Sequence, residues 1–216
     1  MAAGYTEPHW SSSALVVIDM QVDFAEGGAL PIAGTGAVTP NVRRLADGYR
    51  RAGLPIVHIV RLYPPGSSDV DLPRRAFIEA GGVAGAPGTP GSAVIAGIAA
   101  PGEPLPVDAD VLLAGKPQVL AENEIVLFKP RWGAFYRTEL EGWLRDRQVD
   151  TVVVAGCNLP NCPRATLFEA SERDFRTVLA EDAVSQVSAE RLADLAGIGV
   201  VLATTGTVLD GVSAGD

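Results

Sequence analysis

The chain is built from short apolar runs, each followed by a segment with the pattern of a helix. Residues 14–18 read ALVVI, residues 55–61 read PIVHIVR, residues 124–128 read EIVLF and residues 151–155 read TVVVA. Continuous apolar runs of this length are typical of strands buried on both faces of a parallel sheet. Strands that alternate with helices predict a three-layer α/β fold, a doubly wound, mostly parallel sheet with helices on both faces.

The expected helices have recognisable ends. Thr39 is the expected N-cap of the first, with Pro40 at its first position and Gly53 closing it. Leu140 and Leu144 would lie on one apolar face, which indicates another helix. The helices are expected at residues 39–52, 72–80, 138–147, 163–175 and 189–196, further strands at 177–180 and 200–203, and weaker hairpin strands around 111–113.

Residues 64–118 interrupt this alternation. They contain the Gly- and Pro-rich stretches PPGSS, GGVAGAPGTPGS and AAPGEPLP. A chain of 216 residues suits one domain. We therefore expect residues 1–216 to form a single domain with an insertion at about 64–118, which covers the site or packs against a neighbouring subunit.

Charge and composition exclude several classes of partner. The net charge is −9 and the pI about 4.7, so the chain lacks the basic surface that binds nucleic acid or an anionic membrane. No apolar run reaches the length of a membrane span, and the first residues, MAAGYTEPHWSSS, lack the layout of a signal peptide. The sequence predicts a cytoplasmic protein whose two cysteines are thiols.

Three polar residues follow the predicted strands. Asp19 and Lys129 come directly after the runs at 14–18 and 124–128, and Cys162 follows the run at 151–155 after a short loop. Ligands of doubly wound sheets bind at the carboxyl ends of the strands, so these residues are candidates for one site. Taken singly, Asp19 also fits a turn cap, and Lys129 fits a structural ion-pair partner.

Cys162 is the most specific of the three. Pro163 suits the first position of a helix, which makes Cys162 the expected N-cap. A helix N-terminus and a nearby Lys129 would stabilise a thiolate, and Asp19 would accept the thiol proton. The alternatives are a small buried apolar side chain or a disulfide with Cys157.

Three stretches also resemble a known family. They are ALVVIDMQVDF (14–24), FKPRWGAF (128–135) and AGCNLPNCPRATLFEASERDF (155–175), and EDAVS (181–185) fits as well. Over about residues 14–205 the chain resembles the isochorismatase-like superfamily of cysteine hydrolases, which includes nicotinamidases, N-carbamoylsarcosine amidases, ureidoacrylate and biuret hydrolases, and isochorismatases.

The resemblance implies a role for each matching residue. Asp19 would be the general base, Lys129 its charge partner and Cys162 the nucleophile. A non-proline cis peptide is implied between Cys157 and Asn158. The backbone N–H groups of Asn158 and Cys162 would then form the oxyanion hole, with Cys157 packed at the strand end. Members of this family commonly form dimers or tetramers, so a homodimer or homotetramer is expected.

Departures from the family pattern narrow the function. Gly133 replaces a small hydroxyl residue, Pro163 replaces an apolar one, and NLPN replaces a loop of smaller residues. Nicotinamidases bind a metal through an Asp and two His residues, whereas this chain has only His9 and His58, so neither a metal nor another cofactor is expected.

The predicted reaction is hydrolysis of an amide, ureido or carbamoyl C–N bond of a small molecule through a Cys162 thioester. Phe24, Trp132 and Phe135 are candidate pocket walls, although core packing explains them equally well. Arg61 is a candidate ligand for a substrate carboxylate.

Arg131 is a second candidate for that carboxylate, and solvent-facing positions are the alternative for both arginines. Two other functions remain open. One is an isochorismatase-type vinyl-ether hydrolase that uses Asp19 and Lys129 alone, and the other is a catalytically silent binding module.

Overall fold

The computed structural model describes residues 4–99 and 101–215 and is centred on a seven-stranded sheet. The strand order is β3-β4-β2-β1-β5-β6-β7, and neighbours are parallel except that β3 runs antiparallel to β4. The strands are β1 (Ser13–Ile18), β2 (Ile56–Val60), β3 (Gln118–Ala121), β4 (Glu124–Phe128), β5 (Thr151–Gly156), β6 (Arg176–Val184) and β7 (Val201–Ala203). This is the predicted mostly parallel α/β sheet.

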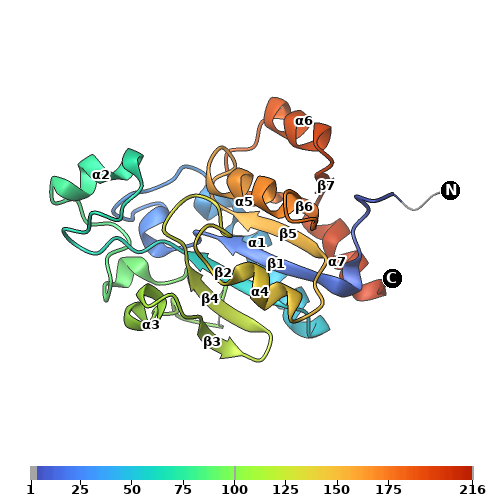
Figure 1. The fold of residues 1–216 in the computed structure, drawn as a ribbon, viewed down its shortest axis with the longest axis horizontal. Helices are drawn as coiled ribbons and strands as arrows, with labels where there is room; N and C mark the ends of the chain where they lie inside the picture. Colours follow the sequence, from blue (N-terminus) through green and yellow to red (C-terminus); the bar gives the residue numbers. More distant parts are fainter. Residues whose placement is uncertain (1–3, 100, 216) are drawn as a thin grey trace.

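Helices cover both faces of the sheet. Side chains of β1 alternate between two core clusters, with Leu15 in the cluster that contains α1 and α7, and Val16 in the cluster that contains α4, α5 and α6. Figure 1 shows α4 and α5 on one side of the sheet and α1 on the other. The helices are α1 (Thr35–Ala52), α2 (Leu72–Glu79), α3 (Ala109–Leu113), α4 (Leu140–Arg145), α5 (Cys162–Ser171), α6 (Ala189–Gly197) and α7 (Thr205–Ala214), with short 3-10 turns at Trp10–Ser12, Val22–Phe24 and Pro90–Ser92.

The first helix begins earlier than predicted. Helix α1 starts at Thr35, so Thr39 and Pro40 lie inside it, and the predicted cap at Thr39 is wrong. The additional turn is supported by Glu26, whose carboxylate accepts a hydrogen bond of 2.8 Å from the N–H of Gly36 at the open end of the helix. The predicted end at Gly53 is confirmed, with a φ of 69°.

The edges of the fold differ most from the prediction. Residues 109–113 form α3, capped by Asp108 through a 3.1 Å bond to the N–H of Val111, so the predicted hairpin strands at 111–113 are wrong. The hairpin partner of β4 is β3 instead. Helix α7 was not predicted, because its sequence TGTVLDGVSA contains two glycines and gives a weak helical signal. Among the described residues, no helix is long and apolar enough to cross a membrane.

The insertion is fastened to the end of β1. The side-chain amide of Gln21 donates to the carbonyls of Arg61 and Ser92, both at 2.9 Å. The carboxylate of Asp23 accepts from the N–H of Gly85 at 2.7 Å. Figure 1 shows α2, which belongs to the insertion, on the side of the molecule toward which β1 points. The insertion therefore lies over the carboxyl end of the sheet, where a site is expected.

Gly156 allows β5 to approach β1 closely at this end of the sheet. Its φ is 116°, and a Cβ atom placed on it would lie 2.2 Å from the carbonyl oxygen of Ile18. A side chain at position 156 would therefore push apart the strands that precede Asp19 and Cys157.

Replacing Gly156 with Ala should destabilise the protein by about 2–4 kcal/mol, because the added methyl group meets backbone and the φ is unfavourable. Urea unfolding measures this. Gly142→Ala is the control, since a Cβ at Gly142 in α4 meets nothing within 4 Å, and it should be neutral or stabilising by up to about 1 kcal/mol. Equal stability of the two variants would contradict the close approach.

A buried ionic cluster joins α1 to the sheet. Glu124 of β4 accepts from Arg50 of α1 at 2.7 and 2.8 Å and from His58 of β2 at 2.7 Å. Burial opposes the charge of Glu124, but the hydrogen bonds from Arg50 and His58 lower its pKa to about 2. Burial also lowers the pKa of His58, so this imidazole is neutral at pH 7.

The Glu124 carboxylate should make the free energy of unfolding depend on pH in the acid range. Because its folded pKa of about 2 lies below the ordinary 4.5, its contribution is present above pH 4.5 and is lost as the pH falls toward 2. We expect Glu124→Gln to remove about 2–3 kcal/mol of the pH-dependent stability between pH 7 and pH 2.5, measured by urea unfolding. The exposed neighbour Glu122 provides the control, and Glu122→Gln should keep the wild-type profile. A wild-type slope in Glu124→Gln would refute the assignment.

Candidate active site

Asp19 and Lys129 are placed on either side of β2 by its backbone. The N–H of Asp19 donates to the carbonyl of Ile59 at 2.9 Å, and the N–H of Lys129 donates to that of Val60 at 3.1 Å. These bonds extend the parallel ladders of β1 and β4 by one residue, so the two side chains emerge at the same edge of the sheet. Asp19 has a φ of 52°, a turn conformation that ends β1 at this point.

Asp19 and Lys129 form a buried ion pair. The ammonium Nζ of Lys129 donates to Oδ2 of Asp19 at 2.9 Å, and their side chains are 0% and 5% exposed. The ammonium also donates to the carbonyl of Arg131 at 3.2 Å. The other carboxylate oxygen, Oδ1 of Asp19, is buried and has no hydrogen-bond partner among the described residues. It is therefore available to accept a proton.

Cys162 lies beside this carboxylate at the first turn of α5. Both residues line the same small cavity. The N-cap of α5 is Asn161, so Cys162 is the first helical residue and Pro163 the second, one position away from the predicted arrangement. A proline is accepted at either of these positions because the first N–H groups of a helix have no partner within it.

The predicted stable thiolate at Cys162 is wrong. Burial raises the pKa of the Cys162 thiol to about 11, and the Asp19 carboxylate acts in the same direction, against the opposing charges of Lys129 and Arg61. The thiol is protonated at pH 7, so any nucleophilic attack requires a base at the moment of reaction. Oδ1 of Asp19 is positioned for that purpose.

Cys157 has a different place. It is fully buried, and its Sγ donates to the carbonyl of Asp19 at 3.2 Å. Both cysteines are free thiols, so the disulfide alternative is wrong. Burial, and then the Asp19 carboxylate, raise the pKa of Cys157 well above its ordinary value. Cys157 thus fastens the turn after β5 to the turn after β1, and the peptide bond between it and Asn158 is cis, as the resemblance implies.

The loop between Cys157 and Cys162 leaves two backbone N–H groups free. Among the described residues, those of Asn158 and Cys162 have no acceptor. The loop itself is held by other bonds, from the N–H of Leu159 to the carbonyl of Ser185 and from the Asn158 amide to Gln186, both at 2.9 Å. Free N–H groups on a fixed loop are what an oxyanion hole requires.

Of the five predicted pocket residues, three line the cavity, and Phe135 and Arg131 do not. The cavity of about 30 Å³ is bordered by Phe24, Arg61 and Trp132 together with Asp19 and Cys162. The predicted place of Phe135 in the pocket wall is wrong. Phe135 is buried in the core on the α5 side of the sheet, where its ring lies 5.7 Å from that of Phe175, centroid to centroid. Core packing, the alternative for each aromatic residue, holds for Phe135.

Both arginines predicted to bind a substrate carboxylate form ion pairs with aspartates of the protein. A guanidinium nitrogen of Arg61 donates to Asp71, and another donates to the carbonyl of Arg131 at 2.6 Å. Arg131 donates to the carboxylate of Asp69 at 2.7 Å and does not line the cavity. Both guanidinium groups are thus paired with a carboxylate of the protein, although Nε of Arg61 is buried and has no hydrogen-bond partner among the described residues.

Several cavity residues were missed. Tyr63, Asp71 and Arg74 come from the end of β2 and from the insertion, and the hydroxyl of Tyr63 donates to Asp71 at 3.2 Å. Ile32 and Asn161 complete the wall. The insertion has no periodic pattern, so no sequence signal placed Asp71 or Arg74 over the site.

The glycine that departs from the family pattern is explained by a neighbour. A Cβ atom on Gly133 would lie 2.1 Å from the carboxyl carbon of Glu169 in α5. That carboxylate accepts from the N–H of Phe135 at 2.9 Å. The Glu169 side chain fills the space that a side chain at position 133 would need.

The two histidines do not converge on a common site. Within residues 4–99 and 101–215, no group of three or more His, Cys, Asp or Glu side chains is arranged to hold a metal ion. His58 belongs to the buried cluster with Glu124, and His9 bonds to Asp150 at 2.6 Å. The expected lack of a cofactor stays a prediction.

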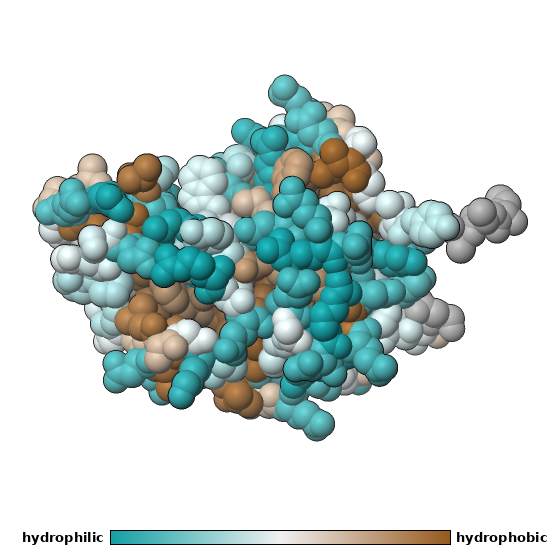
Figure 2. All heavy atoms as spheres, viewed as in Figure 1, coloured by the Kyte–Doolittle hydropathy of each residue, from teal (hydrophilic) through white to brown (hydrophobic). Residues whose placement is uncertain are grey.

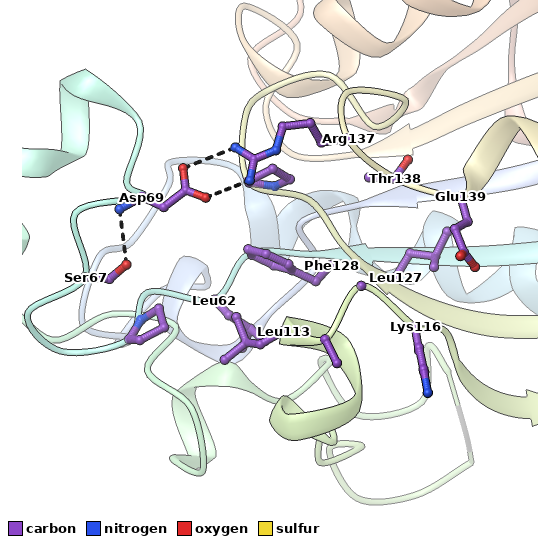
Figure 3. Close-up of a pocket in the computed structure, with 14 residues that line it drawn as sticks. Leu62, Ser67, Asp69, Leu113, Lys116, Leu127, Phe128, Arg137, Thr138 and Glu139 are labelled. Carbon is purple, nitrogen blue, oxygen red and sulfur yellow. Dashed lines mark hydrogen bonds and ion pairs between the residues drawn. The ribbon is translucent and has the colours of Figure 1, made fainter.

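A larger cavity of about 260 Å³ lies nearby. Its wall includes Leu62, Leu113 and Phe128 but neither Asp19 nor Cys162. Figure 2 shows apolar side chains gathered in a hollow beside α3. Figure 3 shows Asp69 turned toward Arg137 at the rim, where the two are 3.1 Å apart. Because this wall has no thiol and no imidazole, the smaller cavity is the candidate active site.

Comparisons with known proteins identify the family of the chain. The isochorismatase domain family model matches residues 13–210. An Arabidopsis thaliana protein described as a probable inactive nicotinamidase is 30% identical over 198 residues, 88% of this chain and 91% of that protein. A ureidoacrylate amidohydrolase of Methylobacterium radiotolerans is 28% identical over 84% of this chain and 70% of its own. The crystal structure of an isochorismatase family protein from Desulfovibrio vulgaris superposes with a TM-score of 0.77 at 31% identity, covering 94% of this chain and 98% of that one.

The raised pKa of Cys162 makes its alkylation pH-dependent. We expect iodoacetamide to react slowly at pH 7 and faster as the pH approaches 11, because only the thiolate reacts. Asp19→Asn removes a negative charge that opposes the thiolate, so the increase in alkylation rate should move to lower pH. Mass spectrometry of the labelled protein measures both profiles.

The other cysteine supplies the control for this experiment. Cys157→Ala should keep the profile, and Cys162→Ala should abolish the reaction, since Cys157 is fully buried. An unchanged profile in Asp19→Asn would show that Asp19 does not act on the Cys162 thiol.

Proposed function

The chain belongs to the isochorismatase family, and we propose that it is a cysteine hydrolase that cleaves a C–N bond of a small amide, ureido or carbamoyl compound. The observation that carries this proposal is the pairing of Asp19. Lys129 binds one carboxylate oxygen at 2.9 Å, while the other is buried, unpartnered and beside the thiol of Cys162. A carboxylate with a purely structural role would have both oxygens satisfied.

In the first half of the reaction, Asp19 acts as the base. Oδ1 accepts the Sγ proton as the sulfur of Cys162 attacks the substrate carbonyl, and the carbonyl π electrons move to oxygen. The N–H groups of Asn158 and Cys162 stabilise this oxyanion. Lys129 holds Oδ2 of Asp19 at 2.9 Å, which leaves Oδ1 without a partner and available for the proton.

Asp19 then acts as the acid. The tetrahedral intermediate collapses, the C–N bond breaks, and Asp19 returns its proton to the departing nitrogen, which leaves an acyl thioester on Cys162. Water, deprotonated by the same carboxylate, attacks the thioester and releases the acid and the thiol. Each proton that Asp19 takes up is given back, so the cycle consumes only substrate and water.

The comparisons support this chemistry at the level of the family. The similar ureidoacrylate amidohydrolase has a name that indicates cleavage of a ureido C–N bond. The similar plant protein is described as a probable inactive nicotinamidase. The proposal that this chain is active therefore depends on its own Asp19, Lys129 and Cys162. A homodimer or homotetramer and a cytoplasmic location remain part of the proposal.

Cys162→Ala should lower the release of ammonia from a panel of small primary amides, ureas and carbamoyl compounds by at least about 10³-fold, because the nucleophile is lost. Asp19→Asn should have a similar effect through the loss of the base. Cys157→Ala is the matched control and should stay within about threefold of the wild type, because Cys157 takes no part in the steps above.

Two other outcomes would point elsewhere. Cleavage of a vinyl ether such as isochorismate that survives in Cys162→Ala would identify an ether hydrolase that uses Asp19 and Lys129. A wild-type protein that turns over none of the panel and forms no acyl-enzyme would be a binding module.

A further inference from the structure

The charges around the active-site cavity are not balanced. Its wall contains the carboxylates of Asp19 and Asp71 and the guanidinium groups of Arg61 and Arg74. Asp19 pairs with Lys129, and Asp71 pairs with Arg61. In the part of the chain that the structure describes, the Arg74 side chain has no hydrogen bond or ion pair. The cavity therefore has one uncompensated positive charge.

The position of Arg74 is defined by the start of α2. Its N–H donates to the carbonyl of Asp71 at 2.9 Å, which fixes the first turn of the helix over the cavity. Its side chain is half-buried, whereas the two preceding residues, Leu72 and Pro73, are exposed. Burial raises the pKa of the Tyr63 hydroxyl, and the charge of Arg74 is among those that oppose this rise, so Arg74 lies close to Tyr63. Arg74, Tyr63 and Asp71 therefore border the same cavity.

The Arg74 guanidinium is not among the buried polar groups and has no partner within the described residues, so it is accessible to an anionic group of a ligand in the cavity. The rest of the wall offers no anion for it. Phe24, Ile32 and Trp132 are apolar or aromatic, and Asn158 and Asn161 are neutral. The protein as a whole carries a net charge of −9, so an anionic substrate needs a local positive charge of this kind.

We infer that the substrate carries a carboxylate and that Arg74 of α2 binds it, which makes Arg74 the residue that determines specificity for anionic amides, ureas or carbamoyl compounds. The inference rests on the proposed function, because it describes the substrate of the same site. Arg61 and Arg131, the arginines predicted from the sequence, are both paired within the protein. A planar guanidinium that binds a carboxylate through two hydrogen bonds would also fix which carbonyl meets Cys162.

Two pairs of probes test the inference by ammonia release. N-carbamoylglycine is compared with N-isobutylurea, and succinamic acid with 4-methylpentanamide, since an isopropyl group has the shape of a carboxylate without its charge. The wild type should prefer each acid by at least about tenfold in kcat/KM. Arg74→Gln should lose about 10- to 100-fold on the acids, mainly through KM, and stay within about threefold on the neutral probes. Arg74→Lys should recover part of the preference.

The neighbouring arginine supplies a matched control. Arg75 is on the same helix but does not line the cavity, and its guanidinium donates to the carbonyl of Ser68 at 2.8 Å. Arg75→Gln removes the same charge and should keep the preference for the acids. Equal losses in the Arg74 and Arg75 variants, or equal losses of Arg74→Gln on acids and neutral probes, would overturn the inference.

The outcomes also separate the inference from the proposed function. Hydrolysis of neutral probes as fast as acids leaves the hydrolase proposal standing and refutes the role of Arg74. If no probe is turned over, calorimetric binding to the Cys162→Ala protein decides. Tighter binding of N-carbamoylglycine than of N-isobutylurea, lost on adding Arg74→Gln, supports the carboxylate site, and equal binding refutes it.

Discussion

The ion pair between Asp19 and Lys129 is the interaction on which the rest of the site depends. Both side chains are buried, so each charge is tolerated only because of the other, and removal of either would leave an unpaired charge in the protein. The pair joins the ends of β1 and β4 across β2, and the backbone of β2 sets its position. It also leaves one oxygen of Asp19 free, and after burial it is the Asp19 carboxylate that raises the pKa of Cys162, against the opposing charge of Lys129. One contact therefore links the fold of the sheet edge to the protonation of the thiol.

The central sheet could be predicted from the sequence because its strands are uniform. Every residue of β1 and of β5 is buried, so the continuous apolar runs report their environment directly. Prediction failed where several structures suit the same residues. Pro40 suits the first position of a helix, yet the helix begins at Thr35 because Glu26, distant in the sequence, supports another turn. The edge strand β3 has only four residues, QVLA, whose apolar and polar residues do not alternate, so it gives little sequence signal.

The active site, too, could be predicted only in part. Asp19, Lys129 and Cys162 follow strands directly or after a short loop, so the fold class alone indicates that they meet. The protonation of Cys162 could not be read in this way, since it depends on the burial of the sulfur and on how close the carboxylate lies. Arg61 pairs with Asp71, and Arg74 lines the cavity, because of where the insertion folds back. A segment without a periodic pattern gives no sequence signal for where it folds.

The size of the active-site cavity has a consequence for how a substrate enters. A volume of about 30 Å³ has room for only one or two water molecules, so a larger substrate would require side chains of the wall to move apart. The segment that leads into α2 is tethered at Asp69, which binds Arg131 at 2.7 Å and Arg137 at 3.1 Å near the surface. Exposed contacts of this kind weaken as dissolved ions screen them. Dissolved ions would therefore weaken the surface ion pairs of Asp69 more than the buried pair of Asp19 and Lys129.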